Sequence, residues 1–192
     1  MTDEKLLENA AAGDETAFVA LYQRHRDLVF RFAYRLLQSQ ETAEKITHDC
    51  FLSLIKEPRR FKADRGKASL RTYLCAAARN LAFKRLRRAG VETAIDDLSE
   101  QLAAAASQEP LRLLLDAEVS EAVRKAVGEL PLLQREALIL FEYEEMSLAE
   151  IAEVSGADVG TVKSRLHRAR ERLRIALAPY FKSVAATEKC RV

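Results

Sequence analysis

The segment 146–174 constrains the fold more strongly than any other part of the chain. It reads MSLAEIAEVSGADVGTVKSRLHRARERLR, and Ser147 with Glu150 has the spacing of a capping box, which opens a helix. Gly156 favours a turn because glycine tolerates a positive φ, and Asp158 is placed to cap a second helix. The sequence therefore predicts two short helices joined by a tight turn.

The second of these helices has an apolar stripe and a basic side. Steps of three and four along the chain form the stripe, which consists of Val159, Val162, Leu166, Ala169 and Leu173. Polar and basic residues occupy the other side, and the predicted DNA contacts are Thr161, Lys163, Ser164, Arg165, His167, Arg168 and Arg172. This arrangement is typical of a helix-turn-helix whose second helix enters the major groove of DNA. The alternative is an ordinary amphipathic hairpin with a solvated basic face.

Composition predicts an all-α protein of two small helical domains joined by a flexible acidic linker. The chain has 192 residues, of which 48% are hydrophobic, with only six glycines and four prolines. The net charge is +2, but it is unevenly distributed: Arg79–Arg88 holds five basic residues and no acid, whereas Val91–Ala122 holds eight acids and one base. Two basic surfaces separated by an acidic connector indicate two contacts with a polyanion.

Apolar spacing and breaker residues divide the chain further. Helices are expected over 4–12, 15–37, 41–57, 69–88 and 113–127, with another beginning at Pro131 and leading into the helix-turn-helix. The predicted domains are 1–90 and 113–182, with a linker at 91–112 and a tail at 183–192.

The helix 69–88 also has two predicted faces. Its core stripe is Leu70, Leu74, Ala77, Ala78 and Leu81, and its other side carries Thr72, Ala76, Arg79, Asn80, Phe83 and Arg87. Arginine and asparagine read base edges, and aromatic rings such as Tyr73 and Phe83 stack on unpaired bases, so this side suits nucleic acid. The alternative is that Tyr73 packs in the core and the arginines are only solvated.

The number and spacing of the cysteines and histidines give no reason to expect a cofactor or a metal ion. Cys50, Cys75 and Cys190 are odd in number and widely spaced, which favours free thiols in a reducing compartment. A metal site joining His48 to Cys50 and Cys75 is a weaker alternative because the spacing matches no metal motif. The chain starts without a signal peptide and has no apolar run near the ~20 residues of a membrane span, so we expect a soluble cytoplasmic protein.

Taken in order, these segments resemble the extracytoplasmic-function (ECF) sigma factors, the compact two-domain branch of the bacterial sigma-70 family. The resemblance is most specific in LPLLQREALILFEYEEMSLAEIAEVSGADVGTVKSRLHRARERLR, which is similar to the region that reads the −35 promoter element. The stretch SLRTYLCAAARNLAFKRLRR is similar to the region that melts and reads the −10 element. The loop Phe61–Ala68 matches the segment that captures a flipped base, and AEKITHDCFLSLIKE resembles the helix that grips core RNA polymerase.

The resemblance implies a bacterial transcription initiation factor, not an enzyme. Its implied partners are promoter DNA, the clamp helices and flap of core RNA polymerase, and an anti-sigma factor. The implied −10 contacts are Phe61, Asp64, Arg65, Lys67, Thr72, Tyr73, Arg79, Asn80, Lys84 and Arg87. The implied polymerase contacts are Glu44, Lys45, His48 and Asp49. The chain departs from the usual family residues at Lys45, His48, Tyr73 and Lys84.

Two other classes of function compete with this interpretation. A stand-alone helix-turn-helix regulator explains the C-terminal domain but leaves the basic helix 69–88 and its preceding loop without a role. An enzyme is disfavoured because the sequence has no glycine-rich phosphate loop, nucleophile elbow or metal cluster.

Overall fold

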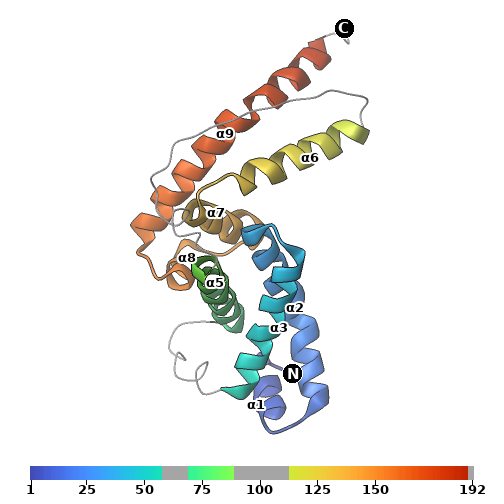
Figure 1. The fold of residues 1–192 in the computed structure, drawn as a ribbon, viewed down its shortest axis with the longest axis vertical. Coiled ribbons are helices and arrows are strands. Elements are labelled where there is room, and N and C mark those ends of the chain that lie inside the picture. The colour runs from blue at the N-terminus through green and yellow to red at the C-terminus, as the bar shows by residue number, and fades with distance from the viewer. Residues whose placement is uncertain (58–68, 89–112, 190–192) are drawn as a thin grey trace.

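The computed structural model describes residues 1–57, 69–88 and 113–189, and every regular element in these ranges is a helix (Figure 1). The N-terminal domain consists of α1 (Asp3–Ala11), α2 (Glu15–Leu37), α3 (Gln40–Lys56) and α5 (Leu70–Arg88). The C-terminal domain consists of α6 (Leu113–Gly128), α7 (Leu132–Leu138), the π-helical segment η2 (Ile139–Tyr143), α8 (Leu148–Ser155) and α9 (Val159–Lys189). The predicted all-α, two-domain fold is confirmed. The predicted linker 91–112 lies outside the described residues.

Side-chain caps place the helix ends close to where the sequence predicts them. Asp14 Oδ1 accepts the backbone N–H groups of Thr16 at 2.9 Å and Ala17 at 3.1 Å, which opens α2. Gln38 ends that helix in the left-handed region with φ of 55°, and the Ser39 side chain then caps α3. These contacts satisfy N–H groups that helix ends leave without intrahelical partners.

The N-terminal core lies where α2, α3 and α5 pack together. Phe32, Ile46 and Leu74 represent the three helices there and are fully buried. The same apolar cluster continues without a break into the C-terminal domain through residues such as Leu140 and Ile151. The two domains are therefore docked on each other, with α5 lying against α8 in the middle of the molecule (Figure 1).

A second, smaller apolar cluster holds the C-terminal domain together. It joins Val127 of α6, Leu138 of α7 and Ala169 of α9, and these helices occupy the upper half of Figure 1. Leu138 faces this cluster, whereas the next residues, Ile139 and Leu140, belong to the first one. Among the described helices, none combines the length and apolar character needed to cross a membrane.

The helix predicted after Pro131 is present, but it widens into a π-helix at η2, where Glu144 N–H donates to the carbonyl of Ile139 at 3.1 Å, five residues back. Two other local expectations are wrong. Thr72 and Phe83 are buried rather than on an exposed side, because α5 packs against α2 and α3 and also against α8. Val159 is 38% exposed, although the sequence predicts it in the buried stripe; it is the first residue of α9.

Candidate nucleic-acid interface

The helix-turn-helix forms through the predicted local contacts. The Ser147 hydroxyl accepts the Glu150 N–H at 3.3 Å, and the Glu150 carboxylate accepts the Ser147 N–H at 2.9 Å, which confirms the capping box. Gly156 ends α8 with φ of +63°. Asp158 then accepts the N–H of Thr161 at 2.8 Å and its hydroxyl at 2.7 Å, which confirms the cap of α9. These bonds fix the start of α9 relative to α8.

One side of α9 is buried and the other is polar and basic. Val162, Leu166 and Ala169 are buried, as predicted, and Leu173 is half-buried. The residues that are exposed on the opposite side are Lys163, Ser164, His167, Arg168 and Arg172. Thr161 and Arg165 are half-buried. Five of the seven predicted DNA contacts on α9 are therefore exposed on one basic surface.

On α5 the predicted DNA contacts separate into three groups. Asn80, Lys84 and Arg87 are exposed. Tyr73 and Arg79 are half-buried, and Thr72 is buried with its hydroxyl 2.9 Å from that of Ser69. The predicted exposure of Thr72 is wrong. Because its hydroxyl contacts that of Ser69, the Thr72 side chain stabilises the start of α5. Phe61, Asp64, Arg65 and Lys67 lie outside the described residues.

Arg79 faces the C-terminal domain. Its guanidinium lies 4.3 Å from the centroid of the Phe83 ring, and its Nε forms an ion pair with Glu136 of α7. The Arg79 side chain is only 17% exposed, and the Glu136 residue is fully buried. Burial raises the pKa of the Glu136 carboxyl, while Arg79 and Arg165 oppose that shift.

The predicted polymerase-binding residues lie on α3. Glu44, Lys45 and His48 are exposed, and Asp49 is half-buried with its carboxylate 2.9 Å from Arg85. Lys45 pairs with Glu41 one turn earlier, and this hydrogen bond holds the pKa of the Glu41 carboxyl below its usual value. The four residues share one helix, and Glu44, Lys45 and His48 have side chains available to a protein partner.

Two family models match the two domains in order. Sigma-70 region 2 matches residues 21–91, and sigma-70 region 4 matches residues 120–173. The ECF sigma factor SigM of Mycobacterium tuberculosis is 32% identical over 173 residues, which cover 90% of this chain and 83% of SigM. This chain belongs to the ECF sigma factor family. SigW of Bacillus subtilis is 28% identical, with 91% of this chain and 96% of SigW covered.

Two solved structures share the fold of this chain. The sigma factor RpoE of Bartonella quintana, in complex with the anti-sigma factor NepR, aligns with a TM-score of 0.63 and 26% identity over 84% of this chain and 96% of RpoE. CnrH, solved with the cytosolic domain of CnrY, aligns with a TM-score of 0.65 and 24% identity over 92% of this chain and 97% of CnrH. As a member of this family, the chain is a transcription initiation factor rather than an enzyme.

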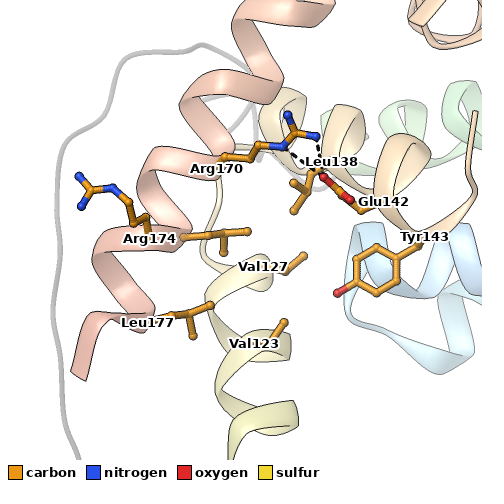
Figure 2. Close-up of a pocket in the computed structure, with 9 residues that line it drawn as sticks. Val123, Val127, Leu138, Glu142, Tyr143, Arg170, Arg174 and Leu177 are labelled. Carbon is orange, nitrogen blue, oxygen red and sulfur yellow. Dashed lines mark hydrogen bonds and ion pairs between the residues drawn. The ribbon is translucent and has the colours of Figure 1, made fainter. Parts of the chain in front are cut away.

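Region 4 of this sigma factor also carries an apolar groove of about 350 Å³ between α6, η2 and α9 (Figure 2). Its apolar lining includes Val123, Leu173 and Leu177. At one side, Arg170 pairs with Glu142 at 2.7 Å. An apolar groove of this kind suits contact with protein rather than with a phosphate backbone.

Two acidic residues that face region 2 were not among the site residues predicted from the sequence. Glu136 and Glu144 are both buried, and Glu144 Oε1 lies 3.1 Å from Arg35 Nη1 of α2. For Glu136 the sequence does contain a sign of burial. Glu136 follows Leu132 by four residues, so it falls on the apolar side of its helix. A carboxylate at such a position indicates a buried ion pair, but not which residue supplies the arginine.

Proposed function

We propose that this ECF sigma factor binds core RNA polymerase and directs it to promoters that carry both a −35 and a −10 element. The observation that carries the proposal is the pair of basic helix surfaces, one in region 4 on α9 and one in region 2 on α5. Phosphate contacts from lysine and arginine supply salt-dependent affinity, whereas contacts to base edges select the sequence.

Contact with the −35 element is assigned to the exposed basic side of α9. Its buried stripe packs the helix on region 4, and Lys163 and Arg168 lie on the opposite side. Serine and arginine side chains near the start of a recognition helix are within reach of base edges when that helix enters a major groove. Ser164 is exposed there, within the second turn of the helix.

Contact with the −10 element is assigned to α5 and the preceding loop. Asn80, Lys84 and Arg87 offer one amide and two cations along an exposed helix side. The family resemblance adds the loop Phe61–Ala68 as the part that holds an unstacked base. Trapping a flipped base costs a few kcal/mol of stacking, which pocket contacts offset, and this exchange would promote melting of the promoter.

Polymerase contacts are assigned to both domains. The exposed residues Glu44, Lys45 and His48 on α3 form the proposed surface for the clamp helices, with Asp49 at its edge. The apolar groove of region 4 is the proposed surface for the flap (Figure 2). Because the related RpoE was solved with an anti-sigma factor, we also propose a regulatory partner of that class for this chain.

A polymerase-dependence experiment separates this proposal from a stand-alone regulator. Binding to a duplex that contains a cognate promoter is measured with the sigma factor alone and with core polymerase added. The proposal expects promoter-specific binding only with core. Glu44→Lys should weaken co-elution with core, whereas Glu4→Lys, an exposed charge reversal on α1, should not. Strong specific binding without core that is unchanged when core is added would overturn the proposal.

A further inference from the structure

Two buried carboxylates of region 4 reach across to arginines of region 2. Glu136 pairs with Arg79 of α5. Glu144 lies 3.1 Å from Arg35 and 3.9 Å from Arg31, both of α2. Arg71 of α5 donates to the backbone carbonyl of Glu144. Both acids belong to the stretch α7–η2 and its end, so one short segment of region 4 supplies the negative charge at this interface.

The pair of Glu136 and Arg79 lies in apolar surroundings that are nearly closed to water, whereas Arg35 and Arg31 are 30% and 51% exposed at their side chains. Leu74 and Ala78 of α5 and Leu140 and Ile151 of region 4 belong to one buried cluster. Arg135 adds a backbone contact, since its Nη1 donates to the carbonyl of Leu36 at 2.8 Å, and burial lowers the pKa of its guanidinium. Charges in such a site interact strongly, and removing one partner leaves an uncompensated buried charge.

Glu136 also belongs to α7, the helix that packs against the recognition helix α9. Its second oxygen, Oε2, is buried and has no hydrogen-bond partner among the described residues. The Nε of Arg165 on α9 is buried in the same way, and the positive charge of Arg165 acts on Glu136. One carboxylate therefore lies under the influence of an arginine from each of the two DNA-binding helices.

We propose that Glu136 is an internal counter-charge that occupies Arg79 and lies on the helix packed against the recognition helix, and so holds this sigma factor in a docked state that competes with promoter DNA. The inference rests on the proposed function, because it assumes that both arginines contact DNA. A carboxylate and a phosphate make the same charge-assisted pairs with a guanidinium, so Arg79 cannot serve both at once. Separation of the two domains exposes Arg79, and Glu144 strengthens docking through Arg31 and Arg35.

The direct test measures the distance between the domains in the full-length chain. Spin labels are placed on cysteines introduced at the exposed Val19 of α2 and Ile175 of α9, in a Cys190→Ser background. The parent should give one narrow distance distribution. Glu136→Gln combined with Glu144→Gln keeps side-chain size and removes both charges, and should give a broader distribution shifted to longer distances. Glu142→Gln is the matched control, because Glu142 is half-exposed and pairs with Arg170 within region 4.

A second arm measures what docking does to DNA binding. Without core polymerase, the doubly substituted chain should bind a −35 duplex about tenfold or more tightly than the parent and the Glu142→Gln control, since more of the chain is in the binding-competent state. Arg79→Gln alone should also broaden the distance distribution, because it removes the ion-pair partner of Glu136. Circular dichroism checks that each variant is folded.

The possible results distinguish a failure of the counter-charge role from a failure of the proposed function. An unchanged distance distribution in the doubly substituted chain overturns the inference, as does an opened chain whose DNA affinity equals that of the parent. If the parent also fails to initiate transcription at any promoter with core polymerase, it is the proposed function that fails. If the parent initiates normally while either of the first two results is found, the function stands and the counter-charge role is wrong.

Discussion

Gly156 shows how a single residue sets the geometry of the helix-turn-helix. It has φ of +63°, and a Cβ added there would meet nothing within 4 Å. The requirement for glycine is therefore conformational rather than steric, because other L-residues are strained in the left-handed region. The turn angle between α8 and α9 depends on this residue.

Gly156→Ala should destabilise the folded chain by about 1–2 kcal/mol, measured by urea unfolding followed by circular dichroism. Gly128→Ala is the matched control. No positive φ occurs there, and an added Cβ would lie 3.7 Å from the Gln38 side chain, which is an ordinary contact. The control should stay within about 0.5 kcal/mol of the parent. Equal losses in the two variants would contradict the conformational explanation.

The two buried thiols, those of Cys50 and Cys75, should react slowly with thiol reagents. Burial raises the pKa of Cys50 and of Cys75 from 9.0 to about 12, so both thiols are protonated near neutral pH. The unfolded chain loses these protons near pH 9 while the folded chain keeps them until about pH 12, so stability should fall as the pH rises through that interval.

The measurement is labelling by N-ethylmaleimide at pH 8, read by peptide mass spectrometry. Both cysteines should label far more slowly in the native chain than in guanidinium chloride. Native labelling of either cysteine at the unfolded rate would show that its thiol is accessible and that the packing of α3 on α5 described above is incorrect.

At the scale of elements, the recognition helix carries a prediction about specificity. Replacing a base-reading arginine should cost about 1–3 kcal/mol of binding and relax preference at one position, whereas losing a phosphate contact should weaken all sequences alike and reduce the salt slope. Lys163→Ala with Arg168→Ala should therefore abolish most −35-dependent transcription. Lys125→Ala, an exposed lysine on α6, is the control. Transcription at the parental level from the doubly substituted chain would refute the role of α9.

The loop before α5 carries a prediction about melting. Arg65→Ala with Lys67→Ala should impair initiation on a fully paired promoter more than on one with a pre-melted bubble, because only the first needs base capture. Initiation rates on the two templates are compared with the parent at the same salt concentration. A mutant that equals the parent on the paired promoter would favour a simple connector role for this loop.

Local sequence signals predicted most helix ends and the helix-turn-helix, because caps and turns depend on neighbours along the chain. Asp14, Ser147 and Asp158 all cap helices in the described structure. The burial of Thr72 and Phe83 was missed because it depends on α5 being covered from several sides. The pair of Arg79 and Glu136 was missed for the same reason, since 57 residues separate its partners along the chain.

At the scale of the whole molecule, the structure combines the two proposed DNA-binding surfaces with an interface that holds one of their arginines. Asn80, Lys84 and Arg87 remain exposed on α5 while Arg79 is turned toward region 4. Contact with both promoter elements requires the domains to sit at the spacing that polymerase and DNA impose. We therefore expect core polymerase to bind the separated form of the chain and to shift the population toward it.

The most direct test of the central claim is reconstituted transcription. Purified core polymerase is incubated with a library of genomic promoter fragments, with and without this chain, and the 5′ ends of the transcripts are sequenced. We expect specific starts only when the chain is present, located downstream of a shared pair of −35 and −10 sequences, and lost with Asn80→Ala or with Lys163→Ala and Arg168→Ala. A set of starts that is the same with and without the chain, or one that is only repressed by it, would contradict the account.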